Sequence, residues 1–160
     1  MYHKIIELMG EVNAMTIHQL SLFLENKPGR LSEPCQVLAK AGIDILTLSL
    51  ADTRQFGIMR LIVRDWQKGK AVLEAAGFVV SDTEVVATEV ADRPGGLAEV
   101  LEIIEDGSVN IEYMYAFTFR SEDKAVLVFR FDNPGAAISL LRAKGVNVIA
   151  GVELYERAEG

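Results

Sequence analysis

With 160 residues, half of them apolar, and one cysteine, the chain suffices for one ordinary domain or two small ones and needs neither disulfide nor metal for stability. The unpaired Cys35, the absence of a secretory signal and the absence of a long apolar run favour a soluble cytoplasmic protein. The net charge of −7 is concentrated in residues 87–160, where 13 acidic residues face 7 basic ones. This excess of acid argues against DNA or RNA as a partner.

Residues 1–15 are expected to form an N-terminal appendage. Apolar residues recur there at helical spacing, but Gly10 and the short length make an independent helix marginal. Met15 is an alternative start of the protein, and the sequence does not decide between the two.

From Thr16 the apolar pattern predicts the order strand, helix, strand, strand, helix, strand. The first helix presents Leu31, Cys35 and Leu38 on one face and ends at Gly42. Asp65 is placed to cap the second helix. The predicted strands are 17–24, 43–51, 56–63 and one that begins at 78–80, with a hairpin loop at 52–55.

The same order repeats in the second half of the chain. A helix there has apolar residues at the spacing i, i+3, i+4, i+7, namely Leu97, Val100, Leu101 and Ile104. Asn133 and Pro134 are typical of the start of the next helix, and Gly145 marks its end. The predicted strands are 85–90, 109–119, 125–131 and 146–154.

The repeat predicts an α+β protein made of two ferredoxin-like βαββαβ sandwiches, each an antiparallel sheet with helices on one face. After the appendage, we expect one domain at 16–83 and another at 84–157. The middle strands, such as 125–131, are apolar on both faces. Since helices cover only one face, we expect the other to pack against the sheet of a second chain and form a homodimer.

No pattern indicates catalysis, a metal site or a cofactor. His3 and His18 lack further ligands at a suitable spacing, and Cys35 on an apolar helical face is typical of a buried, inert thiol. The chain has no nucleophile elbow, P-loop or dinucleotide fingerprint. The adjacent acids Glu122 and Asp123 are expected in a solvated hairpin loop.

Aromatic residues alternate along one predicted strand, at Tyr113, Tyr115, Phe117 and Phe119. RNA-recognition domains of the same fold use such a strand to stack bases. The neighbouring acids and the lack of a basic stripe instead favour aromatics that pack against a partner sheet or line a pocket.

One turn occurs twice, each time between a strand and a helix. Asn26-Lys27-Pro28-Gly29-Arg30-Leu31 is followed 66 residues later by Asp92-Arg93-Pro94-Gly95-Gly96-Leu97. A glycine turn that opens a helix presents backbone N–H groups and the positive end of the helix dipole, which suit a small anion. The same turn also serves as a simple connection. We expect it to hold the carboxylate of an amino acid.

Together with Ala41-Gly42-Ile43-Asp44-Ile45 and Gly107-Ser108-Val109-Asn110-Ile111, these turns give the chain from Thr16 to about Tyr155 its resemblance to a pair of tandem ACT domains. ACT domains are βαββαβ regulatory modules that bind amino acids in many biosynthetic enzymes. No catalytic domain accompanies them here, so the resemblance implies a stand-alone ligand sensor.

The resemblance also implies where the ligand lies. In the serine-sensing ACT domains of phosphoglycerate dehydrogenase, the turn of one domain faces the second strand of another. By similarity, a first site would combine Asn26, Pro28, Gly29, Arg30 and Leu31 with Asn110, Tyr113 and Tyr115. A second, weaker site would combine Asp92, Gly95, Gly96 and Leu97 with Asp44.

The two sites depart from that relative differently. Its histidine two residues before the turn is replaced by Leu24 and Val90, so this contact is absent. In the second site Asp92 and Asp44 would repel a ligand's carboxylate, which favours the first site for a zwitterion. Arg30 is a further candidate partner for the carboxylate.

The chain is therefore expected to be a non-enzymatic cytoplasmic regulator that binds a free amino acid between ACT-like domains, without a cofactor or a membrane partner, and signals to an enzyme or transporter. The alternative is a regulatory subunit that acts by protein contact on a biosynthetic enzyme, with vestigial ligand sites. A small enzyme has the least support. The sequence does not determine which amino acid binds, whether one or both sites bind, or what is regulated.

Overall fold

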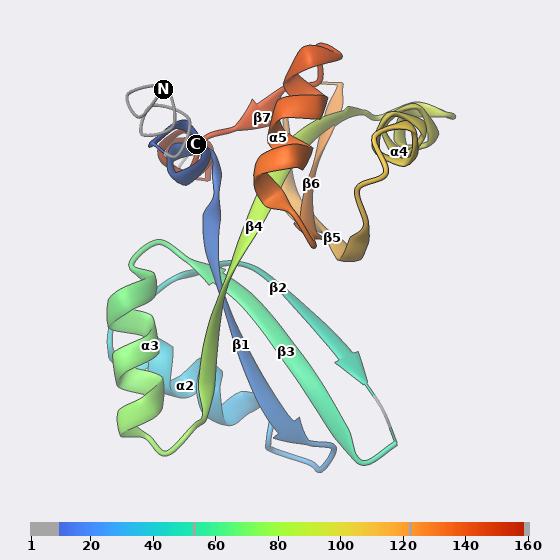
Figure 1. Ribbon diagram of the computed structural model, residues 1–160. Coiled ribbons are helices and arrows are strands. Elements are labelled where there is room, and N and C mark those ends of the chain that lie inside the picture. Colours follow the sequence, from blue (N-terminus) through green and yellow to red (C-terminus); the bar gives the residue numbers. More distant parts are fainter. Residues whose placement is uncertain (1–9, 53, 122, 159–160) are drawn as a thin grey trace. The chain divides into compact units, whose positions relative to one another are not determined.

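The computed structural model describes residues 10–52, 54–121 and 123–158 (Figure 1). Its internal contacts divide the chain into two compact units, each described by itself below. The first unit is His18–Thr83, and the second joins the chain before His18 to the chain from Glu84 onward. The appendage expected at 1–15 is described only from Gly10, and Thr53 and Glu122 in the two expected hairpin loops lie outside the described residues.

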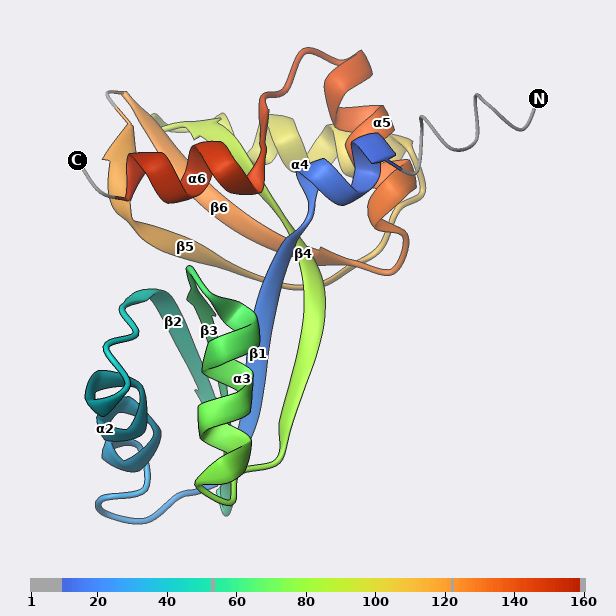
Figure 2. The ribbon, with the colours of Figure 1, turned by 90° about the vertical axis from the view of Figure 1, so that its left-hand side faces the viewer.

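The first unit contains β1 (Ile17–Glu25), α2 (Ser32–Lys40), β2 (Ile45–Asp52), β3 (Phe56–Val63), α3 (Trp66–Ala75) and the first residues of β4 (Val80–Ala91). The strand order is β2-β3-β1-β4, and β3 runs antiparallel to both neighbours. Leu38 of α2 and Leu73 of α3 are fully buried against strand residues such as Leu22. Both helices therefore pack on one face of the sheet (Figure 2).

The second unit contains the rest of β4, α4 (Gly96–Asp106), β5 (Ile111–Ser121), β6 (Lys124–Phe131), α5 (Pro134–Ala143), β7 (Val148–Ile149) and α6 (Gly151–Arg157). β4 pairs antiparallel with β6 and with β7, and β6 pairs antiparallel with β5. Ile104 of α4 and Leu141 of α5 are buried with Phe129 and Phe131 of β6. Val12 and Met15 pack against this same core, so residues 10–15, which are helical, belong with the second unit.

Both units thus have the order βαββαβ, antiparallel pairing and two helices on the core face, which confirms the predicted ferredoxin-like α+β fold. The capping predictions are also confirmed. The Asp65 side chain accepts a hydrogen bond from the Lys68 N–H at 3.0 Å, and Asn133 accepts one from the Ala136 N–H at 3.1 Å. Each side chain satisfies an N–H that the first helical turn leaves without a partner.

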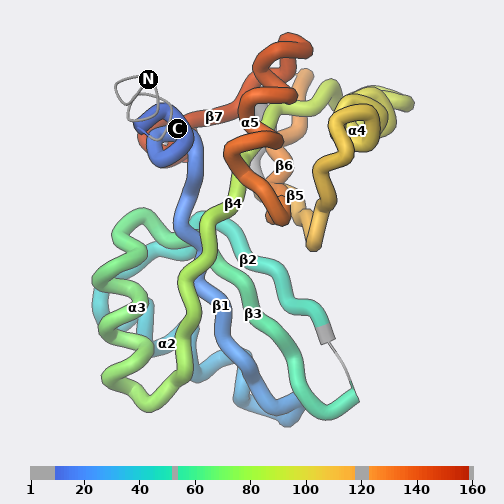
Figure 3. The backbone as a smooth tube through the Cα atoms, viewed as in Figure 1, coloured from blue at the N-terminus to red at the C-terminus, as the bar shows by residue number. Residues whose placement is uncertain are grey.

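β4 differs from the sequence-based expectation of two strands near 78–80 and 85–90. It is one strand of 12 residues that runs from the first unit into the second (Figure 3). The polar residues Ser81, Asp82, Thr83 and Glu84 suggest an interruption, but they contain neither glycine nor proline, so nothing in the backbone stops the chain from staying extended.

The strand predicted at 146–154 is wrong for most of its length. Only Val148 and Ile149 are in β7, and the chain then forms α6. Leu154 of α6 is fully buried, and Arg157 pairs with Glu153 one turn earlier. The alternating apolar residues of this segment predict a strand face, but Val152 is 71% exposed and only Leu154 buries the helix against the core.

Candidate functional site

The first turn connects the end of β1 to α2 and is held by its own backbone. The Lys27 N–H donates to the Glu25 carbonyl at 2.9 Å, the Arg30 N–H to the Lys27 carbonyl at 3.2 Å, and the Ser32 N–H to the Gly29 carbonyl at 3.1 Å. Gly29 has a φ of 89°, in the left-handed region that glycine adopts without strain. The Arg30 N–H, expected to hold a ligand carboxylate, therefore already has a carbonyl acceptor.

The helix begins within one residue of the Leu31 start that the sequence suggests. Leu31 occupies the N-cap position of α2, and no side chain caps the helix, so Asn26 is not its cap. Leu31 is also not on the buried face of the helix, because its side chain is 42% exposed. The Glu33 N–H donates to the Gly29 carbonyl at 3.3 Å, as the Glu99 N–H donates to the Gly95 carbonyl at 3.0 Å in the second turn.

A pocket lies beside this loop. Its volume is about 160 Å³, and it is lined by Leu24, Glu25, Asn26, Lys27, Leu31, Leu50 and Gly57. Two of the predicted site residues, Asn26 and Leu31, are in its wall, while Pro28, Gly29 and Arg30 are in the loop behind it. A single water needs roughly 10–15 Å³ measured in this way, so the pocket has room for a small molecule.

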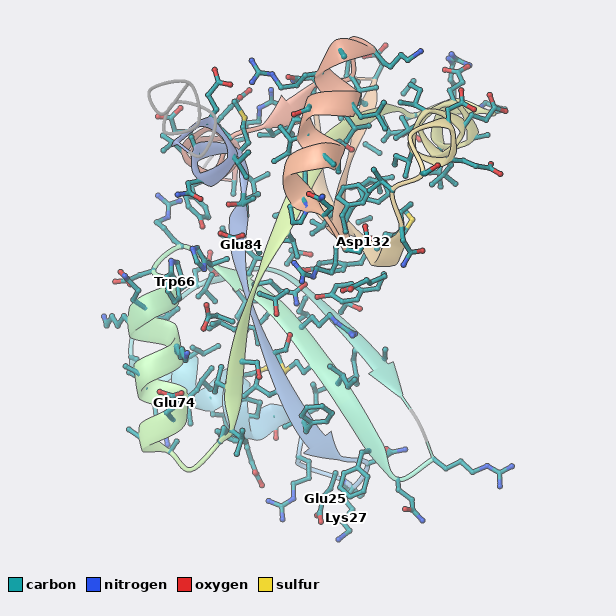
Figure 4. All side chains as sticks on the ribbon, viewed as in Figure 1. Glu25, Lys27, Trp66, Glu74, Glu84 and Asp132 are labelled. Carbon is teal, nitrogen blue, oxygen red and sulfur yellow. The ribbon has the colours of Figure 1, made fainter. Side chains whose placement is uncertain are left out.

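The rim of the pocket carries both signs of charge. The Lys27 ammonium lies 3.1 Å from the Glu25 carboxylate, and both side chains project from the turn in Figure 4. This hydrogen bond from Lys27 lowers the pKa of Glu25. Arg30 is bound to Glu33 at 3.1 Å and lies 3.6 Å from Glu25. The rim therefore offers a cation and an anion side by side in exposed pairs that a ligand can displace at little cost.

The second turn is built more tightly. Gly95, with a φ of 85°, is the N-cap of α4, and the helix starts directly at Gly96. A Cβ on Gly96 would lie 2.0 Å from the carbonyl oxygen of Ala91, so only glycine fits there. Arg30 occupies the corresponding place in the first turn. The cation of the second turn, Arg93, is bound to Glu99 at 2.7 Å.

Gly96 lines a different pocket of about 210 Å³, between the end of β4, the start of α4 and the loop before β7. Of the other residues expected in the second site, Asp92 and Gly95 are exposed and Leu97 is 37% exposed, and none of them lines this pocket.

The residues expected to face the turns come from the starts of two strands. Asn110 is exposed just before β5, and its N–H donates to the Asp132 carboxylate at 3.1 Å. Tyr113 and Tyr115 lie half-buried on β5, and Asp44 is exposed just before β2. Each expected site combines residues of the first unit with residues of the second, so the pairings of Asn26 with Asn110 and of Asp92 with Asp44 remain predictions.

Five residues of the pocket wall were not among the predicted site residues, namely Leu24, Glu25, Lys27, Leu50 and Gly57. Gly57 was detectable, because a glycine inside an apolar strand often marks a place where something approaches the backbone closely. Leu50 was not, because an apolar residue in a strand is normally assigned to the core, whereas here it is 46% exposed.

A buried carboxylate, Glu89 near the end of β4, was not among the predicted site residues either. The side chain is 7% exposed and accepts hydrogen bonds from Lys124 at 3.1 Å, from Asn147 at 2.9 Å and from Arg157. Burial alone would raise the pKa of Glu89, but the bonds from Arg157, Asn147 and Lys124 outweigh it and lower the pKa from 4.5 to about 2. The sequence carried one signal for Glu89, because it is an acid inside an otherwise apolar strand. The network attaches α6 to the sheet.

The other candidates from the sequence, His18 and Cys35, pack against neighbouring residues of the first unit. The His18 ring stacks on Trp66 with centroids 4.0 Å apart and lies 3.7 Å from Asp82. Cys35 is half-buried against the core of the first unit. Within the described residues, no three His, Cys, Asp or Glu side chains gather as metal ligands, and no helix has the length and apolar character needed to cross a bilayer.

Fold and turns define a tandem pair of small βαββαβ modules, the first with a pocket at its strand-to-helix turn. A family model for the ACT domain pair matches residues 15–158. The chain belongs to this family, which confirms the resemblance inferred from the sequence. No curated protein sequence gives a significant match.

Solved structures agree with this assignment. A protein from Bacteroides thetaiotaomicron is 42% identical, with a TM-score of 0.83, over 89% of this chain and 98% of that one. The ligand-free regulatory subunit of aspartate kinase from Thermus thermophilus is 20% identical, with a TM-score of 0.61, over 80% of this chain and 90% of that one. Aspartate kinase from Synechocystis is 23% identical, with a TM-score of 0.56, over 87% of this chain but 27% of that one. The last two show that the fold is shared.

Proposed function

We propose that this protein is a non-enzymatic cytoplasmic regulator that binds a free amino acid at the first turn, with a second ACT domain completing the site. The observation that carries the proposal is the pocket beside Asn26. Its rim holds Glu25 and Lys27 next to each other, and an amino acid carries the two opposite charges that would pair with them.

The first site is favoured over the second. Asn26 provides a neutral donor and acceptor, whereas Asp92 at the matching position is an acid that repels a carboxylate. In the proposed site Asn110 meets the ligand from the facing strand, and Tyr113 and Tyr115 border its side chain. Asp92, Gly95, Gly96, Leu97 and Asp44 would form the weaker site.

The regulatory role is supported by the relatives. The Thermus thermophilus protein is a regulatory subunit of aspartate kinase, and the match to Synechocystis aspartate kinase covers only a fraction of that chain. We propose by analogy that amino-acid binding here signals to a biosynthetic enzyme or a transporter. The second candidate is a regulatory subunit that acts by protein contact while its ligand sites are vestigial.

We also propose a homodimer that uses the open sheet face of the first unit. Phe23, Phe56 and Val79 are 67%, 50% and 80% exposed. In the second unit the matching positions are Glu89, Lys124 and Asn147, and Arg157 of α6 covers them. Since the first unit replaces this polar network with exposed apolar side chains, the same face of a second copy is a suitable partner.

Calorimetric titration and thermal melting of the full chain with each of the twenty amino acids at millimolar concentration test the proposal. A ligand present at a hundred times its Kd stabilises the folded state by about 2.7 kcal/mol, which shifts the melting curve measurably. No heat and no shift for any amino acid would reject the sensor. A stoichiometric protein partner recovered together with empty sites would support the second candidate.

Asn26→Asp locates the site. It places a negative charge where the ligand's carboxylate is expected, so binding should weaken at least about tenfold. The matched control is Asn13→Asp, the same exchange at an exposed position that does not line this pocket, which should leave that binding unchanged. Unaltered affinity in Asn26→Asp would mean that the ligand binds elsewhere.

A further inference from the structure

The pocket at the first turn has two chemically different sides. Its rim is polar, with Glu25, Asn26 and Lys27, and its floor consists of Leu24, Leu31 and Leu50 with Gly57. The ammonium and carboxylate of an amino acid are attached to the same carbon, so both are held at the rim together. The side chain of that amino acid then lies over the floor.

The floor presents apolar surface that a ligand would cover. Leu31 and Leu50 are 42% and 46% exposed, although both border a concave surface and neither belongs to the core. None of the four floor residues has a polar side chain. A ligand side chain with an amide or a charge would lose water there without gaining a hydrogen bond from the floor, whereas a hydrocarbon side chain gains contact.

The floor also limits the size of the ligand. A Cβ on Gly57 would lie 3.1 Å from Cδ1 of Leu50, so Leu50 already rests on the bare backbone of Gly57 and has little room to move back. Leu50 therefore forms the bottom of the pocket, and a bulky ring would have to displace it to enter more deeply.

The second turn lacks this floor. Ala116 is paired with Leu127 on β6, as Leu50 is paired with Met59 on β3, so an alanine replaces the leucine at the bottom. Gly96 replaces Arg30 and brings the helix against Ala91. The two copies of the turn are therefore not equivalent receptors.

We infer that the first turn selects an amino acid with a short aliphatic side chain, that Leu50 is the selecting residue, and that each chain binds one such ligand. The inference rests on the proposed function, since it assigns the ligand class of the same site.

The test is calorimetric titration of the full chain with valine, leucine and isoleucine against threonine, aspartate, lysine and phenylalanine. We expect the aliphatic group to bind at least tenfold more tightly than the charged and aromatic ones, with one ligand per chain. Threonine has the same shape as valine but adds a hydroxyl. An apolar pocket can reject such a ligand by up to about a hundredfold, so threonine should bind more weakly than valine by no more than this factor.

Two variants change the floor in opposite directions. Leu50→Ala should weaken aliphatic binding about tenfold or more and let phenylalanine bind at least as well as valine. Gly57→Ala pushes Leu50 into the pocket and should weaken leucine more than valine. Leu48→Ala is the matched control: Leu48 lies on the same strand, is 44% exposed and does not line the pocket, so it should leave the ligand order unchanged.

The outcomes separate the two levels of the argument. If no amino acid binds, the proposed function and the inference both fall. If the preferred ligand is charged, polar or aromatic, or if Leu50→Ala weakens every ligand equally, the selection by Leu50 is wrong while the amino-acid sensor stands. Two ligands per chain of the same affinity would overturn the non-equivalence of the two turns.

Discussion

Replacing the carboxylate of Glu89 by an amide should make the second unit less stable at neutral pH and remove part of its sensitivity to acid. In Glu89→Gln the side chain keeps its shape but loses the charge that receives bonds from Lys124, Asn147 and Arg157. Arg157 keeps its bond to Glu153, but Arg157 and Lys124 both lose a buried charged acceptor, which is costly because charge-assisted hydrogen bonds are stronger than neutral ones.

The magnitude follows from the pKa of Glu89, which is lowered from 4.5 to about 2. A lowered pKa in the folded state means that the carboxylate stabilises the protein fully above pH 4.5 and that this contribution disappears as the pH falls toward 2. One pKa unit corresponds to 1.36 kcal/mol, so the contribution at pH 7 is about 3 kcal/mol. Glu89→Gln should therefore lower the free energy of unfolding by about 2–3 kcal/mol at pH 7 and by much less at pH 2.5.

Urea unfolding followed by circular dichroism at pH 7, 4 and 2.5 measures the difference between wild type and variant. Other acids titrate in both proteins, so their effects cancel in that difference. Glu99→Gln, which removes the exposed partner of Arg93, is the control and should change stability little. A Glu89→Gln deficit of the same size at pH 7 and pH 2.5, or none at pH 7, would refute the assignment of the stabilisation to the carboxylate.

Three further predictions concern separate parts of the chain. Gly96→Ala should cost about 1–3 kcal/mol in urea unfolding, because its Cβ would lie 2.0 Å from the Ala91 carbonyl oxygen; Gly135→Ala, whose Cβ would keep ordinary distances of 3.7 Å, is the control, and equal effects would contradict the argument. Phe23→Ser should shift the sedimentation coefficient toward the monomer without lowering stability, and an unchanged dimer would place the interface elsewhere. Lys70→Ala should raise the pKa of Asp82 toward its ordinary value in an NMR titration, since the Lys70 hydrogen bond lowers it; an unmoved pKa would show that the bond does not form in solution.

Much of the fold was predictable because its signals are local. The helix starts at Asp65 and Asn133 depend on a side chain three residues away from the N–H that it caps. The repeat itself is visible in the order of strands, helices and glycine turns, and it identifies the family. A local signal also explains one error: residues 146–154 carry an apolar pattern that fits a short strand as well as a helix, and only the burial of Leu154 decides for α6.

The sequence by itself determined that the chain is a pair of βαββαβ modules with matching turns. Only the tertiary structure decided what each turn became. Arg30 and Gly96 hold the same place in the repeat, and the first helical bond follows at the same point in both turns. Only the 2.0 Å between a Cβ built on Gly96 and the Ala91 carbonyl oxygen shows how closely the second helix approaches its strand. Leu50 and Glu89 likewise have unremarkable neighbours in the sequence. Their roles arise from contacts with residues on other strands and on α6, which a pattern along one chain does not contain.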